Sequence, residues 1–392
     1  MNLNSTPSSE RIHIGFFGMR NAGKSSLVNA VTSQNLSLVS DIKGTTTDPV
    51  KKAMELLPLG PVVIIDTPGL DDEGMLGEMR VKKAKETLST VHIAVLVVDA
   101  LKGMSDDDKS LTAEIESRKI PLIIAMNKSD LLASVPENEG NTVYVSAENN
   151  MGINELKDKL ATLSKTAKTD KKILADLVTK GDTVMLVTPI DESAPKGRLI
   201  LPQQQTIREL LEIGAVTLVV QVDEITRALD NLKVPPKLVI TDSQAFGKVS
   251  QLVPEDIKLT SFSILFARYK GDLDTVVKGA DKLLELIDGD KILISEGCTH
   301  HRQCKDIGTV RLPGWIESFS GKQLQFDFTS GGDFPDDLSI YALVVHCGGC
   351  TLSENEMKNR LERCRQQGVP VTNYGTAIAE IHGILRRSLE VF

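Results

Sequence analysis

The sequence predicts an α/β protein of three domains. Short apolar runs with the character of buried strands alternate with stretches of helical pattern along most of the chain. A length of 392 residues suits two or three domains. The polar and charged stretch 165–172 interrupts the alternation and is typical of a linker, so the first domain is expected to end close to it.

Composition narrows the possible functions. The chain is 41% hydrophobic, which is enough for real cores, and its formal net charge is −8 with a pI ≈ 5.4. An acidic chain has no general attraction to nucleic acid or to anionic membranes. Residues 1–10 are polar, and the longest apolar runs are far too short to cross a bilayer. We therefore expect a cytoplasmic protein with no nucleic-acid and no membrane partner, in which cysteines point to metal or redox chemistry.

The first domain opens with a phosphate-binding loop. An apolar strand over 11–17 leads into 18–25, which reads G-M-R-N-A-G-K-S, and a helix is predicted from 26 onward. In that context the backbone N–H groups and the helix N-terminus bind phosphate oxygens. Lys24 is expected to reach the β and γ phosphates, and Ser25 to ligate magnesium.

Four further motifs follow in the order of a GTP-binding domain. The polar loop 44–48 offers Thr46 as a second magnesium ligand, and the strand 62–65 ends in D-T-P-G at 66–69. The strand 121–126 ends in N-K-S-D, whose Asp130 can accept from guanine N1 and N2, a pair of donors that adenine lacks. The strand 143–145 leads into Ser146-Ala147, which would supply backbone N–H to guanine O6. The expected nucleotide contacts are Asn21, Ala22, Gly23, Lys24, Ser25, Ser26, Thr46, Asp66, Gly69, Asn127, Lys128, Asp130, Ser146 and Ala147.

These motifs resemble those of the GTPases that include the tRNA-modifying enzyme MnmE and the ribosome-assembly GTPase Era. Leu70 stands after D-x-x-G, where Ras-like GTPases carry a water-orienting glutamine, so another residue must orient water. The resemblance implies that Glu78 is catalytic together with Lys24, and a solvated helix glutamate is the alternative. It also implies a potassium site at Asn21, for which a turn-forming asparagine is the alternative.

The middle segment predicts a small parallel sheet, because strands and helices alternate over about 90 residues. No catalytic constellation stands out in it. A small sheet with exposed apolar edges often pairs with another copy, so we expect a homodimer formed by this segment. Strands are predicted over 183–187, 215–220 and 237–242, and helices over 206–212 and 223–232.

The last segment carries all five cysteines of the chain. Apolar strands over 291–295 and 339–345 lead into C-T-H at 298–300 and H-C-G-G-C at 346–350. Because the carboxyl ends of parallel strands meet at one edge of an open sheet, the two parts are expected to lie together. The resulting pattern C-x-H…H-C-x-x-C has soft thiolates that suit zinc or an iron–sulfur cluster. Helices are predicted over 273–286, 354–366 and 377–389.

The ligands are expected to be Cys298, Cys347 and Cys350. His300 and His346 either fill a fourth position or hydrogen-bond to sulfur or to bound cargo.

Of the remaining cysteines, Cys304 is interpreted as a spare thiol or a buried packing residue rather than a ligand, and Cys364 as a core residue of a helix. His301 and Arg302 either contact anionic cargo or form a solvated loop.

The GTPase motifs, a connector at 189–202 and the cysteine–histidine pattern together resemble the iron–iron hydrogenase maturation GTPases, over essentially the whole chain. The resemblance implies a GTPase domain at 1–168, a dimerisation domain at 169–260 and an iron–sulfur cluster-binding domain at 261–392. It implies GTP or GDP, Mg²⁺ and a 4Fe-4S cluster on Cys298, Cys347 and Cys350 with a labile fourth position.

The same resemblance implies a carrier. Its cargo would be a binuclear iron precursor built with two radical-SAM maturases, and its acceptor the apo iron–iron hydrogenase. Three-cysteine ligation leaves one iron open, which suits a carrier better than an electron-transfer protein. The alternative is an RNA-associated assembly GTPase with a structural zinc domain, and the acidic charge and the lack of an Arg/Lys-rich terminal module count against it.

Overall fold

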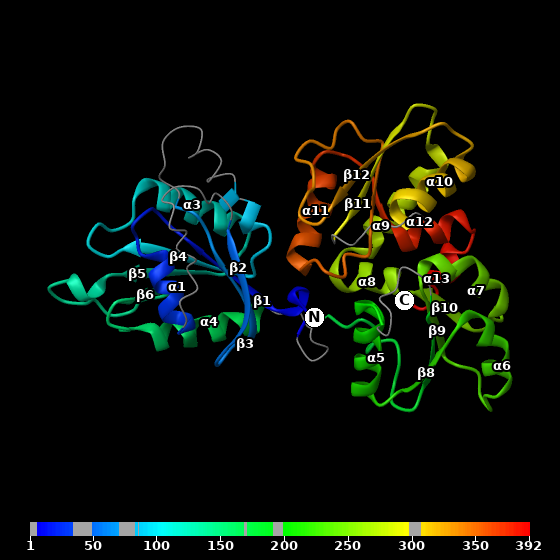
Figure 1. Ribbon diagram of the computed structural model, residues 1–392, viewed down its shortest axis with the longest axis horizontal. Helices are drawn as coiled ribbons and strands as arrows, with labels where there is room; N and C mark the ends of the chain where they lie inside the picture. Colours follow the sequence, from blue (N-terminus) through cyan, green and yellow to red (C-terminus); the bar gives the residue numbers. More distant parts are fainter. Residues whose placement is uncertain are drawn as a thin grey trace. The chain divides into compact units, whose positions relative to one another are not determined.

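The computed structural model describes residues 6–33, 49–69, 83–84, 86–167, 171–190, 199–297 and 307–392 (Figure 1). The chain divides into two compact units, Met1–Asp170 and Lys171–Phe392. Strands and helices alternate in both units, and the strands form largely parallel sheets, so the predicted α/β class is confirmed. The border predicted at 260/261 falls inside the second unit and stays a prediction.

The first unit is a six-stranded sheet in the order β2-β3-β1-β4-β5-β6. All neighbouring strands are parallel except the edge strand β2, which runs antiparallel to β3. The strands are β1 (Ile12–Phe17), β2 (Val50–Leu56), β3 (Gly60–Asp66), β4 (Ile93–Asp99), β5 (Leu122–Asn127) and β6 (Thr142–Tyr144). The helices are α1 (Lys24–Thr32), α3 (Asp106–Ser117) and α4 (Ile153–Ala167), with short 3₁₀ turns at Ser8–Glu10 and Ser129–Leu131.

Helices on both faces explain why the central strands are continuously apolar. Every residue of β4, which reads IAVLVVD, is buried. On one face Ile14 and Phe16 pack with Leu27 of α1, and on the other Leu96 and Ile115 belong to a second core. The helix α3 starts at the capping box of Ser105 and Asp108, with three aspartates in its first turn.

The second unit holds two four-stranded sheets, and the first has the order β10-β9-β7-β8 with all pairs parallel, as predicted. Its strands are β7 (Thr183–Val187), β8 (Val216–Val220), β9 (Leu238–Thr241) and β10 (Lys258–Ser261). The helices are α5 (Leu201–Ile213), α6 (Ile225–Asp230), α7 (Phe246–Leu252) and α8 (Phe262–Lys270), with 3₁₀ turns at Val222–Glu224 and Ser243–Ala245.

Two details of this sheet differ from the prediction. The helix predicted over 206–212 begins at Leu201, because Pro202 suits a first helical turn and Gln203 is buried, donating from Nε2 to Asp242 Oδ2 at 2.8 Å. The strand β10 was not predicted, since K-L-T-S is too short and too polar to stand out.

The other sheet has the order β12-β11-β13-β14, again all parallel. Its strands are β11 (Lys291–Glu296), β12 (Gln325–Ser330), β13 (Leu343–His346) and β14 (Val371–Asn373). The helices are α9 (Leu273–Asp281), α10 (Leu312–Ser320), α11 (Glu354–Gln366), α12 (Tyr374–Ile381) and α13 (Leu385–Leu389), with a 3₁₀ turn at Lys282–Glu285 and a π-helical turn at Ile307–Arg311.

The strand before the cysteine loop is shorter than predicted, and the closing helix is divided in two. The strand expected over 339–345 begins only at Leu343. The single helix expected over 377–389 is two helices, α12 and α13, because Gly383 adopts a positive φ of 69° between them.

Helices join the cores of the two sheets of the second unit, since α12 contributes Ala379 to the core of the first sheet and Ile378 to the core that holds Ile294 and Val345 of the second. Met185 and Val239 of the first sheet belong to the same cluster as Ala280 of α9, Ala379 of α12 and Leu385 of α13. The helices α8, α12 and α13 lie between the two sheets (Figure 1).

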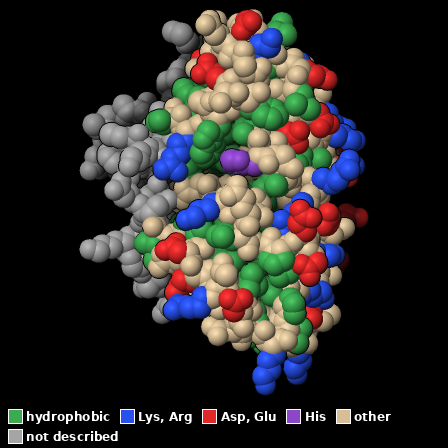
Figure 2. Space-filling view, turned by 90° about the vertical axis from the view of Figure 1, so that its right-hand side faces the viewer, with side chains coloured by type: hydrophobic (Ala, Val, Ile, Leu, Met, Phe, Trp, Pro, Cys, Tyr) green, Lys and Arg blue, Asp and Glu red, His purple; other side chains and the backbone are tan. Residues whose placement is uncertain are grey.

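On the face of the second unit in Figure 2, basic and acidic side chains are interspersed. Across the ranges that the structure describes, no helix has the length and apolar character needed to traverse a bilayer.

Candidate functional sites

The phosphate-binding loop lies between β1 and α1, as predicted. Gly18, Asn21 and Gly23 have positive φ values of 138°, 63° and 88°. A Cβ at Gly18 would lie 2.2 Å from Val97 O, and one at Gly23 would lie 2.3 Å from Asn127 Nδ2, so both positions require glycine. The loop thus presents backbone N–H groups and the first turn of α1 to an anion.

Lys24 is buried at the start of α1, with 7% of its surface exposed. Its Nζ donates to Gly18 O at 2.8 Å and Met19 O at 2.9 Å. These carbonyls hold the ammonium group over the loop, where a phosphate can take their place.

A candidate magnesium site lies beside this lysine. Ser25 Oγ donates to Asp66 Oδ2 at 2.7 Å, while Asp66 Oδ1 is buried and has no hydrogen-bond partner within the described ranges. Burial raises the pKa of Asp66, against the opposing effects of Ser25 and Lys24. An orphaned carboxylate oxygen next to a serine hydroxyl fits the hard oxygen ligands that Mg²⁺ prefers.

Asn127 ties the base side of the site to the phosphate side. It is 2% exposed, its Nδ2 donates to Ala22 O at 2.9 Å, and its Oδ1 accepts from Ala147 N at 3.1 Å. Lys128 has a φ of 65° and pairs with Asp99 at 2.6 Å. Asp130 is exposed, as a carboxylate that reads a guanine must be.

The other expected nucleotide contacts are placed as follows. Ser26 is exposed in the first turn of α1, and Ser146 is fully buried after β6. Gly69 packs on the phosphate loop, since a Cβ there would lie 3.1 Å from Arg20 Cα. Thr46, Leu70 and Glu78 lie outside the described residues, and Asn21 is exposed at a left-handed turn.

The cysteine loop follows β13 in the second unit. β11 and β13 are paired neighbours with Ser295 opposite His346, which confirms that the two predicted strand ends meet. Two backbone N–H groups donate to Cys347 Sγ: that of Gly297 at 3.0 Å and that of Gly349 at 3.4 Å. Burial raises the pKa of the Cys347 thiol to about 11 and also raises that of Cys350.

These features fit a metal bound through thiolates. Two N–H groups aimed at one sulfur favour its anionic form, while burial disfavours it, so a bound metal cation would stabilise the thiolate further. Within the described ranges no group of three or more His, Cys, Asp or Glu side chains forms a complete metal site. The other expected ligands, Cys298 and His300, lie outside those ranges, as do His301, Arg302 and Cys304.

His346 is buried with both ring nitrogens engaged. Arg360 Nη1 donates to its Nε2 at 3.0 Å, so Nδ1 carries the proton and donates to Cys347 O at 2.7 Å. Burial and the Arg360 charge lower the pKa of His346 to about 3. The observed contacts are therefore hydrogen bonds inside the protein, and ligation by Nε2 would require Arg360 to move.

Two buried cations at this site were not predicted. Arg360 of α11 is 4% exposed and also donates to Gly331 O at 2.6 Å and Glu356 Oε1 at 2.8 Å, while Phe334 covers its guanidinium at 5.1 Å. Lys270 of α8 is 3% exposed and donates to carbonyls of the cysteine loop. Both sit in helices, where a charged residue suggests a solvated face.

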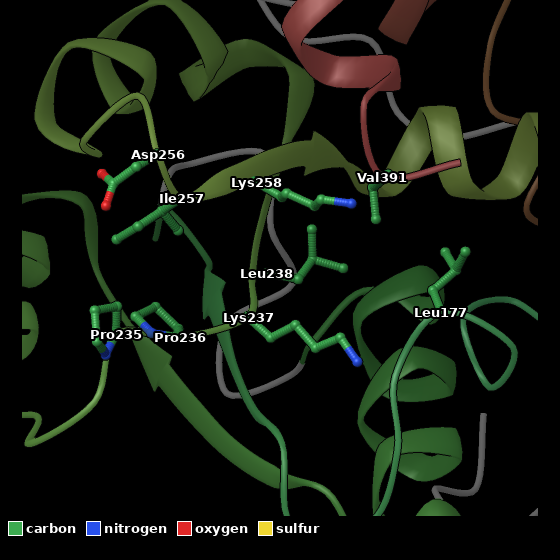
Figure 3. Close-up of a pocket in the computed structure, with 9 residues that line it drawn as sticks. All are labelled: Leu177, Pro235, Pro236, Lys237, Leu238, Asp256, Ile257, Lys258 and Val391. Atoms are coloured by element: carbon green, nitrogen blue, oxygen red, sulfur yellow. The ribbon is translucent and has the colours of Figure 1, made fainter.

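Cys364 packs in the core, as predicted. It is fully buried on α11 beside Leu361 and Val344, and burial raises its pKa to about 12. Away from both sites, a cavity of about 220 Å³ opens at the start of β9 and β10 (Figure 3). Its lining is Leu177, Pro235, Pro236, Lys237, Leu238, Asp256, Ile257, Lys258 and Val391.

Three family models match successive parts of the chain. Residues 13–128 match the model described as 50S ribosome-binding GTPase. Residues 173–271 match the hydrogen maturase F dimerization domain, and residues 274–391 match the hydrogen maturase F tetramerization domain.

Curated relatives match over the GTPase region. The tRNA modification GTPase MnmE of Clostridioides difficile (strain 630) is 31% identical over 154 residues, covering 37% of this chain and 33% of that protein. The GTPase Der of Kosmotoga olearia is 34% identical over 170 residues, covering 38% of each. The chain thus spans little more than a third of the length of these relatives.

Solved structures resemble the chain at low similarity. The Aquifex aeolicus Era structure bound to GDP.AlF4- shares 19% identity with a TM-score of 0.35, covering 53% of this chain and 92% of that one. A probable GTP-binding protein engB shares 22% identity with a TM-score of 0.33, covering 39% and 99%.

Proposed function

Because the chain belongs to the hydrogen maturase F family, we propose that it is a GTP-hydrolysing scaffold of iron–iron hydrogenase maturation. It would hold a 4Fe-4S cluster and deliver a binuclear iron precursor, made with two radical-SAM maturases, to the apo-hydrogenase. The main support is that one chain joins a complete phosphate-binding loop, within the GTPase match, to a half-buried C-x-x-C loop within the hydrogen maturase F tetramerization match.

The first unit is proposed to hydrolyse GTP. Lys24 would exchange its two loop carbonyls for the β and γ phosphates, and Asp130 would read the guanine. Ser25 and Asp66, with Thr46, would hold Mg²⁺, which neutralises charge on the phosphates when bound. Glu78 is proposed as the group that orients water, and Asn21 as a potassium contact; equal rates in potassium and sodium would remove the role of Asn21.

The last segment is proposed to bind the cluster through Cys298, Cys347 and Cys350. When bound, such a cluster has one iron open to an exchangeable ligand, which suits cargo transfer. The backbone N–H groups of Gly297 and Gly349 would stabilise the thiolate of Cys347 whether it binds an iron–sulfur cluster or zinc.

The homodimer is proposed to form through 169–260. β8 is an edge strand, and two of its valines, Val216 and Val219, are 56% and 44% exposed. An apolar edge without charged side chains readily pairs with another copy, and this segment contains the matched dimerization domain.

The alternative is an RNA-associated assembly GTPase with a structural zinc domain. The match of residues 13–128 to the 50S ribosome-binding GTPase model favours it, but that match does not extend into the cysteine segment.

Metal analysis separates the two functions. After anaerobic reconstitution with iron and sulfide, the proposed carrier should hold roughly four irons and four sulfides per chain, with an electron paramagnetic resonance signal after reduction. Stoichiometric zinc with no iron would overturn the proposal and leave the zinc-domain GTPase. GTP hydrolysis is expected in both cases and serves as the check that the preparation is folded.

A further inference from the structure

Lys270 connects the last turn of α8 to the cysteine loop. Its Nζ donates to Cys350 O at 2.9 Å and to Leu352 O at 3.0 Å. The side chain is 97% withdrawn from solvent, since only 3% of its surface is exposed, and its ammonium group lies 5.8 Å from the Phe266 ring. A lysine is rarely buried to this degree, and a buried ammonium group needs hydrogen-bond partners. The two carbonyls of the cysteine loop meet that need.

The other end of α8 touches the same loop. A Cβ on Gly348 would lie 3.6 Å from Ser263 Oγ, and Asn373 Nδ2 donates to Ser263 O at 3.0 Å. Ser261 caps this helix by accepting from Ile264 N, directly where β10 ends. The helix that starts at the first sheet of the second unit therefore contacts the cysteine loop near both of its ends, at Ser263 and at Lys270.

The charge of Lys270 is as important as its hydrogen bonds. A buried ammonium is costly to desolvate, and its cost is offset by nearby negative charge. A centre held by thiolates is anionic, and it gains one further negative charge when it takes up an electron. A fixed cation at the loop should therefore stabilise the reduced form more than the oxidised form.

We propose that Lys270 is a positioning residue that orders the 347–352 loop through the Cys350 and Leu352 carbonyls and favours the reduced state of the centre bound there. The second part rests on the proposed function, because it requires that the loop hold a cluster. The first part concerns the metal-free chain alone.

The loop is tested by amide hydrogen exchange on the metal-free full chain. Lys270→Met removes the donor and the charge but keeps an unbranched side chain, and should speed exchange over 347–352 by about tenfold because two buried carbonyls lose their partner. Lys278→Met, on the exposed face of α9, removes the same charge and should leave these amides as in the native protein. Equal exchange in the two variants would overturn the positioning role.

The charge is tested by a redox titration of the reconstituted protein, with dithionite as electron donor and electron paramagnetic resonance as readout. In Lys270→Met the ratio of reduced to oxidised cluster at a given potential should fall about tenfold, a shift of about 59 mV for a one-electron couple. Lys270→Arg keeps the charge and two donors, and should remain close to the native potential. An unchanged potential in Lys270→Met would overturn this part.

If circular dichroism shows that Lys270→Met does not fold, Lys270→Gln replaces it in both measurements. It keeps a donor and loses the charge, so loop exchange should stay close to native while the potential falls as in the methionine variant. A native potential in Lys270→Gln would overturn the charge effect. If the native chain takes up zinc and no iron, the proposed function fails, while the exchange comparison still decides the positioning role.

Discussion

The phosphate-binding loop and the cysteine loop each follow a buried parallel strand, and a buried lysine donates to two backbone carbonyls of each. Lys24 stands six residues from Gly18 in its own loop, whereas Lys270 reaches Cys350 from 80 residues earlier in the chain. The first loop presents N–H donors that suit an anionic ligand, and the second presents two thiols that, on the proposed function, would bind a metal as thiolates. A loop of donors can be satisfied by its own carbonyls when empty, whereas burial raises the pKa of both cysteine thiols and disfavours the thiolates that a metal would need. The second site therefore depends more on its surroundings.

Removing Lys24 should produce the largest effect. Lys24→Ala should lower GTP hydrolysis on the order of 10²- to 10³-fold, because the transition-state charge on the phosphates loses its cation. Phosphate release is the measurement, and Lys109→Ala, at an exposed position of α3, is the control. Iron uptake should not change, and a parallel loss of iron would show that the two loops are not independent.

The reciprocal change is Cys347→Ser, which should remove most of the bound iron. Serine is nearly isosteric, but its oxygen is hard and does not hold cluster iron as a thiolate does. Iron and sulfide analysis is the measurement, and Cys364→Ser, in the core of α11, should retain the cluster. Hydrolysis of GTP should stay at the native rate in both variants. Full iron content in Cys347→Ser would remove this residue from the ligand set.

Replacing Arg360 tests how much the buried hydrogen-bond network beside the cysteine loop contributes to stability. Arg360→Met should lower the free energy of unfolding of the second unit by about 3 kcal/mol, because it leaves Glu356, His346 Nε2 and Gly331 O without their common donor. Urea unfolding is the measurement. Arg365→Met on the same helix, where the arginine side chain is 74% exposed, should leave the urea midpoint close to the native value. Equal losses would mean that the buried network adds nothing specific.

The smallest expected effect is on the pH dependence of stability, and it arises from a hydrogen bond to β12 outside the cysteine loop. Tyr341 Oη donates to Asp327 Oδ2 at 2.8 Å, and burial together with this carboxylate raises the pKa of Tyr341 to about 12. A raised folded pKa gives stability that is fully present below the ordinary value of about 10 and is lost as the pH rises toward 12. Urea midpoints measured from pH 9 to 11 should fall more steeply in the native protein than in Tyr341→Phe. Parallel curves would contradict the assignment.

The phosphate loop is built from neighbouring residues and the cysteine loop from distant ones, and this difference explains which features could be predicted from the sequence. The phosphate loop is local, so the apolar run 11–17 predicts its strand, and the next eight residues predict its glycines and the position of Lys24. The meeting of the two strand ends was also predictable, because parallel sheets align their carboxyl edges. Lys270 and Arg360 were missed, since each reads as a solvated helix residue until the fold buries it. The first turn of α5 was missed for a related reason: the partner of Gln203 is 39 residues away.

Asn127 has a consequence for the lifetime of the bound nucleotide. One side chain joins the Ala22 carbonyl of the phosphate loop to the Ala147 N–H of the base loop. Loosening either end of the nucleotide therefore disturbs the contacts at the other end, and departure should proceed as a single concerted step rather than by peeling from the base or from the phosphates. A partner protein that displaces this amide would disturb both ends of the nucleotide site at once.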